Sequence, residues 1–517
     1  MLFNIFDESG NWAGIKPFRQ FINFTHLTMR TKYPVILLVL LYLTMLSQAQ
    51  PLSLHPENPH YFEYKGKPLL LITSGEHYGA VINRDFDYLK YLKTLAEDGL
   101  NLTRIFCGTY VENPGSFGIT NNTLAPPAES FLAPWKRTNF EGNKGGGSKF
   151  DLGHWDPEYF ERLKGFLTTA ARHDIIVEVT LFSSIYSDLS WTYCPLYHEN
   201  NINQTDKIDR VNVHTPDNGN LMQYQEKFVQ KLVSELKDFE NIYYEIQNEP
   251  WSDNSDEFFA INPNDSATHL YWRRKADLPN AAANAWQKRI GKLIVKTESN
   301  FEQQHLIAQN FCSFMYPIKE VNDYVSILNF HYAFPQAVEY NYGYDLPVSF
   351  DEDGFCGRED RRYRANAWNF ILAGGGIYNN LDYSFFVGYE DGTLVNDAPG
   401  HGSASLREQL SFLKSFMEGF DFIRLKPSRH LVKLAPGTVP QVLANEGKEY
   451  AVYLHGGSQC DLQLNLPPGK YQATWLNTVS FDSETSEEFD HKGAVKKLIS
   501  PQYDGDIALK IIRTDGK

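Results

Sequence analysis

Short apolar runs alternate with helical patterns along most of this chain of 517 residues, and this alternation restricts the possible folds more than any other feature. The apolar runs predict buried strands at 102–106, 175–181, 242–246, 306–308, 325–330, 348–350 and 377–382, after a strand pair at 61–72. Apolar residues at helical spacing predict helices at 85–98, 159–173, 223–239, 284–298, 364–372 and 406–417. Buried strands separated by helices pair in parallel, because each helix returns the chain to the same end of the sheet.

The number of these units favours a closed barrel over an open sheet. About eight strand–helix units over about 370 residues are typical of a (β/α)₈ TIM barrel, an α/β fold. A G-x-G-x-x-G pattern does not follow the first predicted strand, which disfavours a doubly wound dinucleotide-binding sheet. Two long polar stretches, 113–149 and 252–278, follow the second and fourth strands, on the face where barrels keep their active sites. We expect these stretches to be loops that shape a substrate groove.

The sequence pattern changes at about residue 427. Short alternating runs at 439–443, 450–454, 462–466, 471–475 and 507–512 are separated by Gly, Pro and Asn. This pattern predicts a small all-β sandwich at 427–517, following a barrel at 50–426. Two roles are open for the sandwich, a structural cap on the barrel and sugar binding.

The N-terminal segment has the pattern of an export signal. A short basic region begins at Met29, an apolar run spans 34–46, and the small residues Ser47 and Ala49 stand at the −3 and −1 positions of a cleavage site. These features predict a signal peptide at 29–49 and an upstream extension at 1–28. The apolar run is short for a transmembrane helix, so we expect a secreted or periplasmic protein without membrane insertion after cleavage.

Composition disfavours several classes of partner. The net charge of −15, without clustered Lys and Arg, argues against nucleic acid as a ligand. The five cysteines are scattered and odd in number, which argues against a disulfide framework and a cysteine zinc site. No His or carboxylate cluster has metal-ligand spacing, so we expect neither a metal nor a cofactor. The sequence does not indicate an oligomeric state.

Two carboxylates end predicted strands in a way that points to chemistry. The strand at 242–246 runs into Asn248-Glu249-Pro250, and the strand at 348–350 runs into Glu352. Strand ends of a barrel meet on one face, so these side chains should face each other. Hydrolysis of a glycosidic bond needs such a pair, one carboxylic acid to protonate the leaving oxygen and one carboxylate to attack or to activate water. Glu352 is in phase with Val348 and Phe350, which favours it over the alternatives Asp351 and Asp353.

Asn248-Glu249-Pro250 and Glu352-Asp353-Gly354 resemble the strand-four and strand-seven signatures of clan A glycoside hydrolases, most closely the cellulase-type family 5. The resemblance spans about residues 60–425. It implies a (β/α)₈ barrel, Glu249 as acid/base, Glu352 as nucleophile, and retention at the anomeric carbon. It further implies that Asn248 binds the sugar 2-hydroxyl, that Arg104 orients the nucleophile and that Tyr332 donates a hydrogen bond to it.

This chain departs from the cellulase-type pattern at three places, and one of them is the third strand, 175–184, which lacks the substrate-binding histidine expected after it. Phe330 stands where the family has a histidine, with His331 one position later, and Tyr383 and Phe385 stand where a tryptophan is usual. The C-terminal segment resembles modules that follow related barrels and carry a collagen-binding label.

Further candidates for substrate contact follow strand ends. Glu76 and His77 follow the first strand, Tyr110 begins the second loop, and Trp251 follows the acid/base motif, where its ring could stack on a sugar. Each of these residues could equally be structural. Asn379, Asn380 and Asp382 lie near the end of the eighth strand.

Three functions are compatible with these residues. The leading hypothesis is a retaining hydrolase of extracellular polysaccharides or oligosaccharides, so a carbohydrate is the expected partner. The alternatives are a non-catalytic carbohydrate-binding protein on a degenerate barrel, and a transglycosylase.

Overall fold

The structure is a computed structural model that describes residues 51–262, 271–396 and 398–515, all within one compact unit, Gln50–Lys517. The predicted upstream extension at 1–28 and signal peptide at 29–49 lie outside the described residues. None of the helices within those three ranges has the length and hydropathy needed to cross a membrane.

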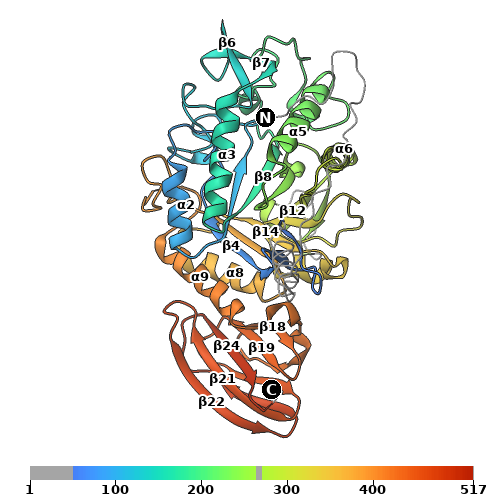
Figure 1. Cartoon of the computed structure of the whole chain (residues 1–517). Helices are drawn as coiled ribbons and strands as arrows, with labels where there is room; N and C mark the ends of the chain where they lie inside the picture. The colour runs from blue at the N-terminus through green and yellow to red at the C-terminus, as the bar shows by residue number, and fades with distance from the viewer. Residues whose placement is uncertain (1–50, 263–270, 397, 516–517) are drawn as a thin grey trace, which may run out of the picture. The chain divides into compact units, whose positions relative to one another are not determined.

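Eight parallel strands form the barrel, in the order β4-β15-β14-β13-β12-β9-β8-β5 (Figure 1). Between the first and last of these, the side chain of Asn101 accepts a hydrogen bond from Ile72 N at 3.0 Å and donates one to Leu70 O at 2.8 Å. Together with a backbone hydrogen bond from Asn101 N to Ile72 O at 3.4 Å, this amide links β4 to the start of β5. The predicted TIM barrel is therefore confirmed. Its strands are β4 (Leu71–Gly75), β5 (Leu102–Phe106), β8 (Ile176–Ser183), β9 (Ile242–Asn248), β12 (Ile307–Ser313), β13 (Ile327–His331), β14 (Val348–Asp353) and β15 (Ile377–Leu381).

Helices surround the barrel, and the predicted ones are present with shifted ends (Figure 1). Several begin at a side chain that accepts a hydrogen bond from a free backbone N–H of the first turn, as Asp156 does for α3 and Ser403 for α9. The sequence pattern missed α7 because it has only seven residues, too few to show helical spacing. The helices are α2 (Tyr88–Glu97), α3 (Pro157–Arg172), α4 (Asp188–Trp191), α5 (Leu221–Leu236), α6 (Ala281–Glu298), α7 (Pro335–Asn341), α8 (Asp360–Ile371) and α9 (Ala404–Glu418).

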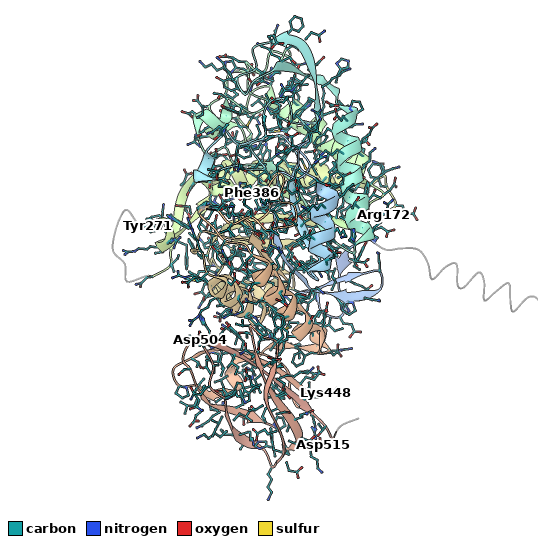
Figure 2. The ribbon with its side chains drawn as sticks, turned by 90° about the vertical axis from the view of Figure 1, so that its left-hand side faces the viewer. Arg172, Tyr271, Phe386, Lys448, Asp504 and Asp515 are labelled. Carbon is teal, nitrogen blue, oxygen red and sulfur yellow. The ribbon has the colours of Figure 1, made fainter. Side chains whose placement is uncertain are left out.

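The long polar stretches contain hairpins, where the sequence predicts only loops. The first holds β6 (Trp135–Glu141) and leads into β7 (Ser148–Trp155), and the second holds β10 (Ser255–Ala260) and β11 (Lys275–Pro279). Most of their side chains are at least partly exposed and many are polar, so the strands lack the regular alternation that marks a half-buried strand. Figure 2 shows Tyr271, just before β11, at the outside of the molecule, whereas Phe386 is buried.

Antiparallel strands make the C-terminal all-β domain. One sheet has the order β16-β18-β19-β24-β21-β22 and the other β17-β20-β23. The sequence missed β22 because its side chains are nearly all polar, and β23 because its mostly exposed residues do not alternate between apolar and polar. The strands are β16 (Lys426–Pro427), β17 (Val432–Leu434), β18 (Val439–Asn445), β19 (Glu449–His455), β20 (Asp461–Leu466), β21 (Gly469–Asn477), β22 (Ser483–His491), β23 (Ala494–Ile499) and β24 (Asp506–Arg513). A separate small sheet, β1 (Ser53–Leu54), β2 (Phe62–Tyr64) and β3 (Lys67–Leu69), precedes the barrel.

A buried ion pair joins α8 of the barrel to β24. Arg364 donates to both carboxylate oxygens of Asp506, at 3.0 and 2.6 Å, and Tyr453 donates to the same carboxylate at 2.9 Å. Trp368 stacks on Tyr453 with ring centroids 5.3 Å apart. Charged groups buried in this way depend on each other, because neither retains its water.

We expect Asp506→Ala to destabilise the protein by about 3–5 kcal/mol, since it leaves the Arg364 guanidinium buried without its counter-ion. Thermal and urea unfolding would measure the change. Arg361→Ala is the matched control, because its pair with Asp504 is 3.6 Å long and exposed, with side-chain exposures of 50% and 98%. Equal effects of the two substitutions would contradict a specific role for the buried pair.

Candidate active site

The carboxyl ends of β9 and β14 bring Glu249 and Glu352 together. One carboxylate oxygen of each, and one ring nitrogen of His331 from β13, all lie within 4.8 Å of one another. Glu249 is 9% exposed and Glu352 is 5% exposed, so both groups are largely withdrawn from water but remain accessible. The two glutamates singled out in the sequence thus form a pair across the mouth of the barrel.

Three donors hold the Glu352 carboxylate. Tyr332 donates to Oε1 at 2.7 Å, Tyr78 donates to Oε2 at 2.8 Å, and Arg104 donates to Oε2 at 3.4 Å. Burial alone would raise the pKa of Glu352, but the charges of His331 and Arg104 and the hydrogen bond from Tyr332 outweigh it and hold the pKa well below its usual value. These contacts favour the ionised form of the Glu352 carboxylate.

Glu249 has different neighbours from Glu352. His331 Nδ1 lies 2.9 Å from its Oε1, and Tyr186 donates to its Oε2 at 2.8 Å. The Asn248 side chain links the two glutamate environments, since its oxygen accepts from Arg104 at 2.8 Å and its nitrogen donates to Tyr186 at 2.7 Å. Each carboxyl group is thus fixed in orientation by its own set of hydrogen bonds.

A layer of buried polar side chains lies beneath this pair. Arg104 also bonds Glu245, and Glu245 accepts further hydrogen bonds from Thr180 at 2.8 Å and Asn310 at 3.0 Å. Asn329 joins the network by donating to both Glu245 and Asp351. Burial raises the pKa of Asp351 to about 6, because the charges of His331 and Arg104 only partly offset the loss of water. Barrel interiors are usually filled by branched apolar residues, so this polar layer is a distinctive feature of the chain.

Backbone strain is concentrated around the same site. Tyr78, Glu249, Tyr332 and Phe355 adopt φ values of +60°, +46°, +51° and +56°. Each non-glycine residue in this region costs about 1–3 kcal/mol, and such residues gather at functional sites where the surrounding fold imposes the geometry. Three of the four carry the side chains that form or directly hold the carboxylate pair.

The carboxylates open into a stepped cavity. An inner pocket of about 60 Å³ is lined by Glu352, Glu249 and His77, among others, and leads to an outer cleft of about 620 Å³. The two share the side chains of Phe117, Tyr186, Glu249, Tyr332 and Phe355. Trp251 and Trp272 line the outer cleft, and Trp272 packs edge-on against Tyr332 with ring centroids 5.6 Å apart.

Of the remaining residues that the sequence suggested for substrate contact, some line the pocket and others support its walls. His77 and Trp251 line the cavity, and His77 Nε2 lies 3.3 Å from a carboxylate oxygen of Glu112. The Glu76 carboxylate instead accepts hydrogen bonds from Ala80 N and Thr123, so it fixes its own loop. Tyr110 is buried and packs edge-on against Tyr186, behind the pocket wall.

Other acidic and amide candidates point away from the pocket. Asp353 accepts hydrogen bonds from Tyr378 at 2.7 Å and Asn366 at 3.0 Å, outside the barrel lumen. Asn380 donates to Ser74, and Asp382 accepts from Ser74 and Arg407. Asn379 donates to the backbone oxygen of Asp351 at 2.9 Å. These groups support the strand ends from behind.

Sequence reasoning missed Tyr78, Tyr186 and Phe355. Tyr78 directly follows the flagged Glu76-His77 pair, but its role depends on a left-handed backbone that turns its side chain toward Glu352. Tyr186 follows the third barrel strand, where the sequence lacks the histidine expected for cellulase-type enzymes. A tyrosine at a strand end was the available signal, although only the fold shows which glutamate it meets.

Two groups of buried residues have ligand atoms close enough for a metal, Glu245 with His331 and Asp351, and Glu249 with His331 and Glu352. Their oxygens accept hydrogen bonds from Arg104, from amide nitrogens and from tyrosine hydroxyls. The Arg104 guanidinium already pairs with Glu245, Asp351 and Glu352, and its positive charge disfavours a second cation among these carboxylates.

The fold is that of a (β/α)₈ barrel protein with a C-terminal all-β domain, and solved structures share it. A structure described as a glycoside hydrolase aligns at a TM-score of 0.58 and 14% identity, over 90% of this chain and 98% of that one. A glycoside hydrolase family 5 structure from Bacteroides vulgatus ATCC 8482 aligns at 0.59 and 12% identity, over 90% of this chain and 93% of that one. No protein-family model and no curated protein matches the sequence significantly. At such low sequence identity these similarities establish the fold only, and the activity has to be inferred from the residues of the site.

A pH-dependent stability follows from Asp353, which is fully buried and whose pKa is raised by that burial to about 7. Between about pH 4 and pH 7 the folded protein keeps a proton that the unfolded chain has lost, so stability falls as pH rises through this window. Asp353→Asn removes this loss. We therefore expect the melting temperature of the variant, relative to the parent, to increase from pH 4 to pH 8. A difference that stays constant with pH would contradict the raised pKa.

Proposed function

We propose that this protein is a retaining glycoside hydrolase that cleaves O-glycosidic bonds in extracellular polysaccharides or oligosaccharides. The observation that carries the proposal is the pair Glu249 and Glu352, with carboxylate oxygens within 4.8 Å across the mouth of a (β/α)₈ barrel. The sequence resemblance to clan A glycoside hydrolases and the shared fold of the family 5 structure support the same class.

The spacing of the two carboxylates supports retention over inversion. Retaining enzymes hold their carboxyl groups about 5–5.5 Å apart, whereas inverting enzymes leave about 6.5–9.5 Å to accommodate a water molecule. The close approach of Glu249 and Glu352 leaves no room for that water between them. Direct attack by one carboxylate is the reaction that this geometry favours.

In the first half-reaction, Glu352 attacks the anomeric carbon while Glu249 donates its proton to the leaving glycosidic oxygen. The carbon–oxygen bond to the leaving group breaks as the ester bond to Glu352 forms. In the second half-reaction, Glu249 takes a proton from water, which attacks the anomeric carbon and releases Glu352 as a carboxylate.

Surrounding side chains divide the two tasks between the glutamates. Arg104, Tyr78 and Tyr332 stabilise negative charge on Glu352, so it is ready to attack and becomes a good leaving group in the second step. Tyr186 and His331 orient Glu249. In this arrangement the Asn248 amide lies beside both glutamates, where a hydrogen bond to the sugar 2-hydroxyl would strengthen in the transition state.

The cleft favours a substrate longer than one sugar. The volume of about 620 Å³ is within the range of pockets that enclose extended ligands, and Trp251 and Trp272 offer flat apolar faces along it.

The extracellular setting rests on the signal peptide predicted from the sequence. A binding protein on a degenerate barrel is disfavoured because both glutamates and their hydrogen-bond donors are in place. A transglycosylase would use the same residues and is distinguished by its products when an acceptor alcohol is supplied.

The first test uses the chain from Gln50 and its Glu352→Ala variant. The parent should release sugar from an aryl glycoside with retained configuration, followed by NMR of the first anomer formed. Glu352→Ala should lose at least about 10³-fold in kcat because the step that forms the covalent intermediate is removed. Azide should restore release and give the glycosyl azide of inverted configuration, since azide then attacks from the vacant side. An active Glu352→Ala variant, or an inverted first product from the parent, would overturn the mechanism.

A second test concerns the ionisation of Glu352. Tyr332→Phe removes the 2.7 Å hydrogen bond to the carboxylate and raises the pKa of Glu352. Because Glu352 must be ionised to attack, the acidic limb of kcat/KM should move to higher pH, by about one unit. Tyr110→Phe is the control, because the Tyr110 hydroxyl has no hydrogen-bond partner within the described residues. Identical pH profiles for Tyr332→Phe and the parent would contradict the assignment.

A further inference from the structure

Strand β12 presents functional side chains on two opposite faces. Asn310 turns into the barrel, where its amide donates to Glu245 at 3.0 Å and to Asp351 at 3.2 Å. Side chains alternate along a strand, so the flanking residues Gln309 and Phe311 turn outward. A register shift between Asn310 and Cys312 then interrupts the alternation. The outward face of β12 is therefore separate from the lumen that holds the two catalytic glutamates.

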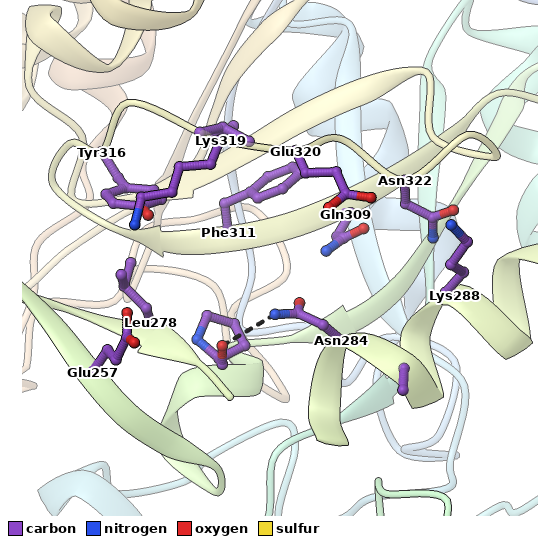
Figure 3. A pocket seen from close by; sticks show the side chains of 13 residues that line it. Glu257, Leu278, Asn284, Lys288, Gln309, Phe311, Tyr316, Lys319, Glu320 and Asn322 are labelled. Carbon is purple, nitrogen blue, oxygen red and sulfur yellow. Dashed lines mark hydrogen bonds between the residues drawn. The ribbon is translucent and has the colours of Figure 1, made fainter. Parts of the chain in front are cut away.

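This outward face lines a second pocket of about 370 Å³ (Figure 3). The start of α6 and the hairpin of β10 and β11 supply two more walls, and the segment after β12 supplies the last. In Figure 3 the aromatic rings of Phe311 and Tyr316 lie on one side of the space, with Asn284 and Leu278 on the other. Neither catalytic glutamate lines it.

We propose that this second pocket binds a neutral sugar unit of the polysaccharide on which the active site acts, and so holds the polymer at a place distinct from the cleft. The identity of the ligand as a glycan rests on the proposed function. The evidence for a binding site comes from the side chains that line the pocket, through their shape, their polar groups and their charge.

The aromatic wall suits the apolar face of a sugar ring. Phe311 is 8% exposed and Tyr316 is partly buried, so their rings are fixed at the pocket surface and are not free in solvent. Phe259 of β10 packs edge-on against Tyr316 with ring centroids 5.7 Å apart and sets the orientation of that ring. Rigid aromatic surfaces of this kind bury C–H groups with little loss of side-chain freedom.

A buried amide supplies the polar recognition. Gln309 is 4% exposed, and its side-chain oxygen has no hydrogen-bond partner anywhere in the part of the chain that the structure describes. The oxygen is shielded from solvent in this conformation, but the last torsion of a glutamine is soft, and its rotation would turn the amide toward the pocket that Gln309 lines. A sugar hydroxyl would then pair with the turned amide, and the apolar ring face of the same sugar would meet Phe311 beside it.

The charges around the pocket favour a neutral ligand over an anion. Lys288 and Lys319 carry positive charge, and Glu257 and Glu320 carry an equal negative charge. An acidic polymer would meet both carboxylates as well as both ammonium groups. A neutral, hydroxyl-rich ligand can accept hydrogen bonds from the two ammonium groups and donate hydrogen bonds to the two carboxylates.

The hairpin of β10 and β11 forms a common wall between this second pocket and the catalytic cleft. Glu257 and Leu278 line the second pocket, whereas Ser255 and Lys275 line the cleft. A polymer held in the second pocket is therefore kept close to the site of cleavage. This arrangement predicts an advantage on long substrates that small aryl glycosides do not share.

The experiment measures binding in the Glu352→Gln background, where the polymer stays intact. Affinity electrophoresis would use gels that contain galactomannan, xyloglucan, mixed-linkage β-glucan or arabinan. Tyr316→Ala and Gln309→Met should each raise the apparent Kd for at least one polymer about tenfold, as expected for the loss of one stacked ring or one buried hydrogen bond. Phe140→Ala is the control, since this exposed aromatic residue lines neither pocket.

A second measurement uses the variants with Glu352 restored. The ratio of kcat/KM on the retarding polysaccharide to kcat/KM on an aryl glycoside should fall by a similar factor in Tyr316→Ala. Melting temperatures identify a misfolded variant, and if Gln309→Met is unstable, Tyr316→Ala alone decides.

The outcomes separate this inference from the proposed function. The inference is overturned if the polymers retard both variants as strongly as the parent. It is also overturned if none of the polymers retards the parent. If the parent cleaves aryl glycosides in either case, the proposed function survives. If the parent cleaves no glycoside but Tyr316→Ala and Gln309→Met lose retardation, the pocket is a glycan site and the catalytic proposal fails.

Discussion

The buried guanidinium of Arg104 is the group on which the active site depends. It bonds Glu352, Glu245 and Asn248, and so links the Glu352 carboxylate, the polar layer beneath it and the strand that leads to Glu249. Its ring neighbour Tyr78 lies under the guanidinium at 4.6 Å, where the π face also favours the cation. Removing this one charge would leave several buried carboxylates without compensation, a state that proteins avoid by unfolding or by taking up protons.

The polar layer explains how a barrel can hold so much charge in its interior. Glu178, Glu245, Asp351 and Glu352 share two cations, Arg104 and His331. Burial by itself would lower the pKa of His331, but the charges of Glu352 and Asp351 outweigh it and raise the pKa well above its usual value. The excess of acids is relieved by protonation, since burial raises the pKa of Glu178 well above normal. Among these four acids, Glu178 thus takes up a proton, whereas the pKa values of Glu245 and Glu352 are held below their usual values by the nearby cations.

The strained residues show the complementary contribution of the scaffold. Tyr78, Glu249 and Tyr332 occupy a left-handed backbone region that their side chains disfavour, and each ends a strand or follows one within a few residues. Eight paired strands and the surrounding helices supply enough stability to impose that geometry. In return, side chains from three different strands point at one another instead of at solvent.

The sequence by itself determined the barrel and the positions of the two glutamates, Glu249 and Glu352, at its mouth. Both are local properties of the sequence, since apolar runs indicate buried strands and the two glutamates closely follow such runs. Arg104 and Tyr332 were identified by resemblance, and His331 by its place beside Tyr332. The tertiary structure alone decided that Tyr78 and Tyr186 hold the glutamates, that Glu76 supports a loop, and that two polar stretches form hairpins. These features depend on backbone turns and on contacts between residues far apart in the chain. The partners of a side chain are set by which distant residues lie beside it once the barrel has closed. The type of the residue alone does not specify them.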